Sequence, residues 1–250
     1  MGSELMSFEV ARFAASDDLE ALRRCQRLRY RVYCEELGFD PPDMDHVRRL
    51  DVQANDPVCD LLMVTRKDDG ELAGTIRIQG PGAGPYYAED EFVLDGAWWQ
   101  GRQLVEGARF AVSPAYRDGV VPLLLFRAFR DGCRERRLTD LVSVVLIPDT
   151  GQDPQIPLRA LRWLIGRVEL EMDRARPRPG YLYAPFASLS PADLADVPPA
   201  ADRSLPPMLR MLATPRSTLC SPPAYCRKFG TWNFLLVTDL APRGGLRSAP

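Results

Sequence analysis

The sequence has little of what metal sites and histidine-based hydrolases require. His46 is the single histidine among 250 residues, and the six cysteines stand at irregular spacings without a C-x-x-C pair. A structural zinc site needs closely spaced cysteine and histidine ligands, so we expect no metal site. His46 lies in the proline- and aspartate-rich stretch Asp40–Arg49, away from any nucleophile motif, which disfavours a Ser-His or Cys-His hydrolase.

Long hydrophobic runs are also missing. The longest, Val120–Phe126 and Leu141–Ile147, are far shorter than the roughly 20 residues that span a bilayer. The N-terminus has neither a basic region nor an apolar run, so no secretory signal is visible, and we expect Met1–Leu5 to be an expression remnant ahead of Met6. These absences predict a cytoplasmic protein, with any contact to the inner membrane peripheral.

Lysine is scarce, and the charges nearly balance. Thirty of the 32 basic residues are arginines and the formal net charge is -2, which disfavours a nucleic-acid partner because phosphate neutralisation needs a concentrated basic surface. A hydrophobic content of 46% and a charged content of 26% are ordinary for a globular protein. At this length we expect one α/β domain over residues 6–250, with an elaborated, proline-rich C-terminal third from about residue 176.

Apolar periodicity predicts strands that alternate with helices. A helix capped by Ser16 and ending near Gly38 carries Arg24, Arg27 and Arg31 on one face. The other expected elements are the strands Phe8–Phe13, Leu61–Arg66, Glu71–Gln79, Leu104–Ser113, Leu141–Ile147 and Thr231–Leu240, and the helices Pro122–Arg137 and Pro157–Met172. After an initial meander, this order favours a mixed α/β sheet over an all-parallel one.

The strand Leu104–Ser113 carries two charges in apolar surroundings. In an ideal strand Glu106 and Arg109 point to opposite faces, unless a bulge at Gly107 re-aims one of them. Charges in an apolar strand are costly to bury unless they are paired or functional. Spacing alone therefore leaves two interpretations open, an edge strand with two solvated charges or a functional site.

A turn follows this strand and leads into a helix. Ser113–Gly119 precedes the expected helix at Pro122, so N–H groups at the helix N-terminus would be free to bind an anion or a carbonyl. As a phosphate motif the turn is weak, because it has one glycine and Pro122 removes a donor. The helix places a stripe of arginines on one face, formed by Arg127, Arg130, Arg134 and Arg137. That stripe suits either an acidic partner or an ordinary solvated face.

Six short motifs occur in a characteristic order. They are LRYRVYCEELG (Leu28–Gly38), DVQAND (Asp51–Asp56), GTIR (Gly74–Arg77), EF (Glu91-Phe92), EGAR (Glu106–Arg109) and YRDG (Tyr116–Gly119). Their order and spacing resemble the acyl-ACP-dependent branch of the GNAT fold, which includes ornithine lipid-forming N-acyltransferases, N-acyl amino acid synthases and acyl-homoserine lactone synthases. The ornithine acyltransferase group looks most similar, because DTGQDP (149–154) and the C-terminal LPPML and KFGTWNFLLVTDL resemble its own segments.

The resemblance implies a fold and a reaction. The fold would be a GNAT-type α/β fold with a mixed, mostly antiparallel twisted sheet flanked by helices. The reaction would move a fatty acyl group from acyl-ACP or acyl-CoA to the amine of an amino acid such as ornithine. No bound cofactor is expected besides that donor substrate. The implied partners are acyl carrier protein and a small amine acceptor, and a lipid product would bring the protein into peripheral contact with the membrane.

The resemblance also implies roles for individual residues. Glu106 would be the general base, acting through a water, and Arg109 would hold a carboxylate or orient the acidic residues. The charged cleft would be completed by Arg31, Asp51, Asp56 and Arg77. The pantetheine arm of the donor would lie along Phe110, Ala111 and Val112, with its phosphate near Arg117 and Gly119. Because the arginine stripe comes right after this donor turn, we also hypothesise that it docks the acidic carrier.

Two departures from the resembling group concern the acceptor. Where that group has D-x-D-x-F-D, this chain has Gln53 and Asn55 between Asp51 and Asp56, so one carboxylate and one aromatic are absent. Leu61 stands where the group has a histidine. We therefore expect a different amine pocket. Two alternatives stay open: an acyl-homoserine lactone-type autoinducer synthase, which would also use S-adenosylmethionine, and a non-catalytic acyl-carrier or lipid-binding module on the same scaffold.

Overall fold

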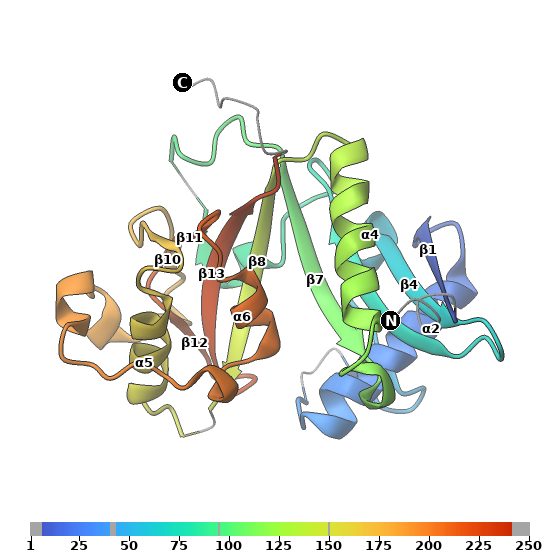
Figure 1. Ribbon diagram of the computed structural model, residues 1–250, viewed down its shortest axis with the longest axis horizontal. Helices are drawn as coiled ribbons and strands as arrows, with labels where there is room; N and C mark the ends of the chain where they lie inside the picture. The colour runs from blue at the N-terminus through green and yellow to red at the C-terminus, as the bar shows by residue number, and fades with distance from the viewer. Residues whose placement is uncertain (1–6, 41–43, 95, 150, 242–250) are drawn as a thin grey trace. The chain divides into compact units, whose positions relative to one another are not determined.

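The computed structural model describes residues 7–40, 44–94, 96–149 and 151–241 and divides into two compact units (Figure 1). Unit 1 comprises Met1–Pro85 and Val105–Arg137, and unit 2 comprises Tyr86–Leu104 and Leu138–Pro250. Each unit has strands and a core of its own and is described by itself. The single domain expected over residues 6–250 stays a prediction.

Unit 1 is built on an antiparallel sheet with the strand order β1–β4–β5–β7. Its strands are β1 (Phe8–Ala14), β4 (Asp60–Arg66), β5 (Leu72–Gln79) and β7 (Leu104–Val112), with a separate short pair of β2 (Met44–Asp45) and β3 (Leu50–Asp51). Its helical segments are α2 (Leu19–Tyr30), the π-helical η1 (Arg31–Glu36), the 3-10 turns η2 (Asp56–Val58) and η3 (Pro114–Tyr116), and α4 (Val121–Glu135).

Two adjacent residues of β5 show that α2 and α4 cover opposite faces of this sheet. The Thr75 hydroxyl donates to Sγ of Cys25 on α2 at 3.2 Å. A Cβ built on Gly74 would instead lie 2.9 Å from side-chain atoms of Leu125 and Val121 on α4. Successive strand residues point to opposite faces, so the sheet lies between the two helices. In Figure 1, α4 crosses the strands of unit 1 on the viewer's side.

The cap of the first helix lies two residues later than expected. The carboxylate of Asp18, not Ser16, accepts the Ala21 N–H at 2.9 Å and caps α2. The helical path continues through the π-helical segment and ends before Gly38, whose φ of 71° is a left-handed conformation that glycine adopts easily. Buried side chains of this helix and of the sheet form the core of unit 1, among them Leu22, Cys25, Leu28, Leu61, Met63 and Ala111.

The main strands of unit 2 follow the order β8–β13–β11–β9 and run in mixed directions. Its strands are β8 (Asp140–Pro148), β9 (Glu169–Leu170), β11 (Ser217–Leu219), β12 (Ala224–Cys226) and β13 (Thr231–Asp239), with the separate pair β6 (Phe92–Val93) and β10 (Arg176–Pro177). Strand β13 runs antiparallel to β8, β11 and β12, while β11 and β9 are parallel. The expected mixed, mostly antiparallel sheet with flanking helices is thus confirmed.

The helices of unit 2 are short. They are α3 (Ala88–Glu91), α5 (Gln155–Leu164), α6 (Pro207–Leu212) and the 3-10 turns η4 (Ala184–Phe186), η5 (Pro191–Leu194) and η6 (Asp202–Ser204). The expected helix Pro157–Met172 is wrong at its C-terminal end, because Ile165 leaves the helical conformation and Gly166 has a φ of 80°. In the described part of the chain, no helix has the length and apolar character needed to cross a membrane.

Candidate functional site

A buried ion cluster in unit 1 is centred on Arg29 of α2. The side chain of Arg29 is fully buried and donates to both carboxylate oxygens of Asp56, at 3.0 and 2.7 Å. Its Nε lies 3.1 Å from Oδ2 of Asp51, and its Nη2 donates to the backbone carbonyl of Asp51. Removing one partner of such a pair would leave an uncompensated buried charge, so the three residues depend on one another.

Two glutamine side chains complete the hydrogen bonding of these carboxylates. Gln26 donates to Oδ2 of Asp56 at 3.0 Å, and the Gln53 side chain donates to Oδ1 of Asp51 at 2.7 Å. Burial alone would raise the pKa of Asp56, but the charge of Arg29 and the hydrogen bonds from Arg29 and Gln26 outweigh it and lower that pKa. The amide at position 53 therefore gives Asp51 a hydrogen-bond donor where a carboxylate would repel it.

Arg77 enters the cluster from β5. Its side chain is 1% exposed, and its Nη1 donates to Oδ1 of Asn55 at 2.6 Å and lies 3.5 Å from Oδ1 of Asp56. Burial, together with the neighbouring charges of Arg109 and Arg29, lowers the pKa of Arg77. The sheet thus delivers a second guanidinium to the carboxylates that already hold Arg29.

A β-bulge in β7 aims Arg109 at the same cluster. The register with β5 shifts between Ala108 and Ala111, so the bulge lies at Arg109 and Phe110. Gly107 stays in register opposite Ile78, and the bulge considered there from the sequence is not found. Arg109 has a φ of 54°, a left-handed conformation that is uncommon for residues other than glycine. Its Nε lies 3.6 Å from Oδ2 of Asp51. The extra residue of the bulge therefore turns this side chain toward the α2 face of the sheet.

Tyr33 of the π-helical segment holds the bulge in place. Its hydroxyl donates to the backbone carbonyl of Phe110 at 2.9 Å, and the Arg109 guanidinium lies 5.7 Å from its ring centroid. Burial raises the pKa of Tyr33 to about 12, so the hydroxyl keeps its proton. A protonated phenol can donate this hydrogen bond throughout the physiological pH range.

Glu106 lies on the same face of β7, three residues before Arg109. Its Cα is paired with Gln79 of β5, whose side chain accepts a hydrogen bond from Asn55 at 2.8 Å. Burial raises the pKa of the nearby Cys59 thiol to about 11, and the charge of Glu106 contributes to that rise. Glu106 itself is 2% exposed. Directly paired residues of antiparallel strands share a face, so Glu106, Arg77 and Arg109 surround one region.

The other expected site residues fall into three groups. Asp51, Asp56 and Arg77 lie in the cluster with Arg109. Arg31 is exposed at the start of the π-helical segment and has no ion pair in the part of the chain that the structure describes. Phe110 lies in the bulge, and the backbone of Ala111 and Val112 after it is paired with Thr75 and Gly74 of β5.

The turn after β7 is held by contacts within the chain. The Arg117 guanidinium pairs with Glu36, and its Nε donates to the Val112 carbonyl at 3.0 Å. The Gly119 N–H donates to the Tyr116 carbonyl at 3.4 Å. An acyl donor that used Arg117 would therefore have to share this guanidinium with Glu36.

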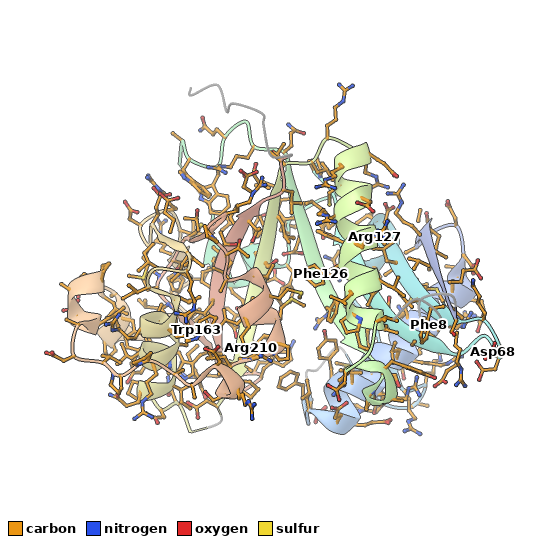
Figure 2. The ribbon with its side chains drawn as sticks, viewed as in Figure 1. Phe8, Asp68, Phe126, Arg127, Trp163 and Arg210 are labelled. Atoms are coloured by element: carbon orange, nitrogen blue, oxygen red, sulfur yellow. The ribbon has the colours of Figure 1, made fainter. Side chains whose placement is uncertain are left out.

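The arginine stripe on α4 is shorter than expected. The helix ends at Glu135, and Arg137 lies beyond it with a φ of 58°, so Arg137 does not continue the stripe. Arg127, Arg130 and Arg134 are exposed on the helix. Figure 2 labels Arg127 next to Phe126, whose ring packs against Phe110 with centroids 5.8 Å apart.

Sequence reasoning missed Arg29, although a signal was present. Arg29 follows Leu22 by seven residues and Cys25 by four, so it falls on the apolar face of α2. A charge on a buried helix face is costly unless it is paired, which distinguishes Arg29 from the solvated Arg31. Tyr33 was also missed, because a hydrogen bond to a bulged strand leaves no pattern in the sequence.

A separate hollow of about 450 Å³ lies on the surface of unit 1. It is lined by Arg23, Arg27, Arg48 and Leu50.

Within the described ranges, no group of three or more His, Cys, Asp or Glu residues is arranged to hold a metal ion. The carboxylates of the cluster are instead bound by guanidinium groups, an arrangement suited to a zwitterionic or charged organic ligand.

Comparisons with known proteins identify similar acyltransferases. Residues 28–127 match the acetyltransferase (GNAT) domain. Over 187 residues the chain is 30% identical to an L-ornithine N(alpha)-acyltransferase of Rhodobacter capsulatus, covering 71% of this chain and 70% of that protein. Over 150 residues it is 28% identical to an enzyme of the same name from Agrobacterium fabrum, covering 56% of this chain and 50% of that protein.

Solved structures of acyl-transferring enzymes share the fold. A CoA-dependent acyl-homoserine lactone synthase, solved with SAM and isopentyl-CoA, has a TM-score of 0.52 at 13% sequence identity. The similarity covers 94% of this chain and 85% of that one. A second CoA-dependent acyl-homoserine lactone synthase has a TM-score of 0.50 at 14% identity, covering 94% of this chain and 90% of that one. At these identities the likeness concerns the fold alone.

Proposed function

Because this chain belongs to the GNAT acyltransferases, within the family of the L-ornithine N(alpha)-acyltransferases, we propose that it acylates the α-amine of an amino acid such as ornithine. The protein is an acyltransferase that acts on an amine. The finer proposal is a fatty acyl thioester as donor, carried by acyl carrier protein or by CoA. The observation that carries it is the placement of Glu106 and Arg109 on one face of β7, beside a buried charged cluster.

Glu106 is the proposed general base. The amine of an amino acid is protonated near neutral pH and has to lose a proton before its nitrogen can attack a thioester carbonyl. In the proposed step, Glu106 takes this proton through a water, the free amine attacks, the C–N bond forms and the C–S bond breaks. The second proton that the nitrogen loses goes to the departing thiolate, which leaves as the thiol. Glu106 is buried, while its neighbours Gly107 and Ala108 are partly exposed. This supports a base that contacts a substrate bound along this part of β7.

Arg109 is proposed to orient the acidic side of the site. Its guanidinium lies close to Asp51 and above the Tyr33 ring, while 12% of the side chain stays exposed. A partly exposed arginine that is held by a buried carboxylate is pre-organised for a second anionic contact. The left-handed backbone at Arg109 is a local strain of the kind found at functional sites.

The donor thioester is proposed to bind where β7 leads into α4. The first-turn N–H groups of α4 have no side-chain cap, since Val120 occupies the N-cap position and Pro122 follows it. Free N–H groups at a helix N-terminus favour a phosphate or a developing oxyanion. Phe110, Ala111, Val112, Arg117 and Gly119 lie along the path to this helix and remain the proposed contacts of the pantetheine arm.

The α4 stripe formed by Arg127, Arg130 and Arg134 is the proposed docking surface for acyl carrier protein. Arg127 and Arg134 have only weak contacts with Asp131, at 3.8 and 3.6 Å, and all three arginines are exposed. Loose surface pairs of this kind contribute little stability, so the charges stay available to an acidic partner. The stripe also follows directly on the proposed donor site.

One assay tests the proposal against its alternatives. Purified protein is incubated with long-chain acyl-ACP or acyl-CoA and a panel of amines, and the products are analysed by mass spectrometry. An N-acyl amino acid supports the proposal. A lactone formed only with S-adenosylmethionine would assign the chain to signal synthesis, and donor binding without any turnover would make it a binding module.

A further inference from the structure

One edge of the Arg77 guanidinium carries no hydrogen bond. Nη1 is engaged by Asn55 and Asp56, but Nε and Nη2 are buried and have no acceptor among the described residues. These two nitrogens form the edge with which an arginine binds a carboxylate through two parallel hydrogen bonds. We propose that this edge is the binding site for the carboxylate of the amino-acid acceptor. The inference rests on the proposed function and assigns one part of the acceptor to one side chain.

Among the described residues, no carboxylate accepts a hydrogen bond from the Nε–Nη2 edge of Arg77. Arg29, Arg77 and Arg109 share the two carboxylates of Asp51 and Asp56, and both carboxylate oxygens of Asp56 accept hydrogen bonds from Arg29. A buried guanidinium with unsatisfied donors carries a desolvation cost that a carboxylate would offset. Burial and the charges of its two arginine neighbours lower the pKa of Arg77, in agreement with this desolvation cost.

The small residue opposite Arg77 gives a ligand room to approach. Ala108 of β7 is directly paired with Arg77, so the two side chains share a face of the sheet. Ala108 is partly exposed while Arg77 is 1% exposed. On the β7 side, a ligand that approaches Arg77 therefore meets a methyl group and not a large side chain.

The spacing along β7 leaves room for an α-amino acid together with the water proposed between its amine and Glu106. Glu106 and Ala108 are two residues apart, which is roughly 7 Å along a strand. An α-amino acid that places its carboxylate on Arg77, beside Ala108, then directs its amine back toward Glu106. Such an arrangement selects amino acids over simple amines, because an amine without the carboxylate would leave the Arg77 edge unsatisfied.

The experiment compares two acceptors that differ only in the carboxylate. The ratio of kcat/KM for ornithine to that for ornithinamide is measured for the wild type, for Arg77→Lys and for Arg24→Lys as a matched surface control. We expect the wild-type ratio to fall by about 100-fold in Arg77→Lys, because a site built for two hydrogen bonds discriminates strongly against their loss. Intrinsic differences between the two amines cancel in this comparison. The Arg24→Lys control changes a side chain that donates to the Gly70 carbonyl, outside the ion cluster, and should keep the wild-type ratio.

A binding measurement separates this inference from the proposed reaction. Calorimetry without the acyl donor measures the Kd of each acceptor. For the wild type, the Kd of ornithine should be at least about 100-fold lower than that of ornithinamide. Equal binding of the two by the wild type would overturn the inference even if Arg77→Lys failed to fold, and so would an unchanged ratio in Arg77→Lys. If no amine is acylated but ornithine still binds selectively, the reaction fails while the carboxylate site stands.

Discussion

Arg29 is expected to be the most stabilising charged side chain in unit 1, and its replacement by methionine tests that expectation. The side chain is fully buried and donates to Asp56 twice and to the Asp51 carbonyl once, with a further ion contact to Asp51. Methionine keeps a similar length but leaves both carboxylates without their main partner. Breaking a buried ion pair from one side costs about 3–5 kcal/mol, and we expect a loss of this size for Arg29→Met.

Equilibrium denaturation in urea measures the loss, and a double-mutant cycle assigns it. Arg29→Met, Asp56→Asn and the double variant are compared with the wild type. Because the two residues share hydrogen bonds, the double variant should lose less than the sum of the single losses, by about 1–3 kcal/mol. If urea unfolding is not reversible, the same order should appear in melting temperature, with a drop of about 2–4 °C for each kcal/mol in a chain of this size.

A neighbouring arginine provides the control. Arg31→Met removes an exposed guanidinium that has no ion pair in the described structure, so its stability should stay within about 0.5 kcal/mol of the wild type. If Arg29→Met also stayed within that range, the cluster would not stabilise unit 1 and the reasoning from burial and pairing would be refuted.

Three further predictions concern the surroundings of the site. Tyr33→Phe removes the hydroxyl that donates to Phe110, and urea denaturation should show a loss of about 1 kcal/mol; no loss would mean that the bulge needs no support. The pKa of Asp56 is lowered in the folded state, so the stability it contributes is present above about pH 4 and is lost as the pH falls through the lowered pKa. The stability difference between wild type and Asp56→Asn should therefore shrink from about pH 6 to about pH 3, and a constant difference would contradict the assignment. Charge reversal of Arg130 and Arg134 should raise KM for acyl-ACP about tenfold or more and leave KM for ornithine unchanged, whereas an unchanged KM for the carrier would exclude this docking surface.

The helices and strands of unit 1 were predictable because their patterns are local. Alternation and helical periodicity located β1, β4, β5, β7, α2 and α4 to within a few residues. The errors lie at the ends, where capping decides. Asp18 replaces Ser16 as the cap of α2, and Gly166 lies two residues after the end of α5, where the sequence suggested a longer helix.

The site was predictable in part, because some of its geometry depends on contacts between distant segments. The motif order brought Asp51, Asp56, Arg77, Glu106 and Arg109 into consideration, and the structure brings four of them into one ion cluster, with Glu106 on the same face. The bulge could not be located from alternation, since an extra residue in one strand is defined by its partner strand. To predict that Arg29 and not Arg31 enters the cluster, one has to know which face of the helix is buried. The position of each arginine relative to that apolar face gives the answer.

The proposed reaction depends on Glu106 as the acceptor of the proton from the attacking amine. Glu106→Gln keeps the shape of the side chain and removes its basicity. With the acyl donor that the wild type uses and ornithine as acceptor, we expect kcat to fall by about 10²–10⁴-fold, while Kd for ornithine stays close to the wild-type value. A kcat within about twofold of the wild type would contradict the account, because the amine would then lose its proton without this carboxylate.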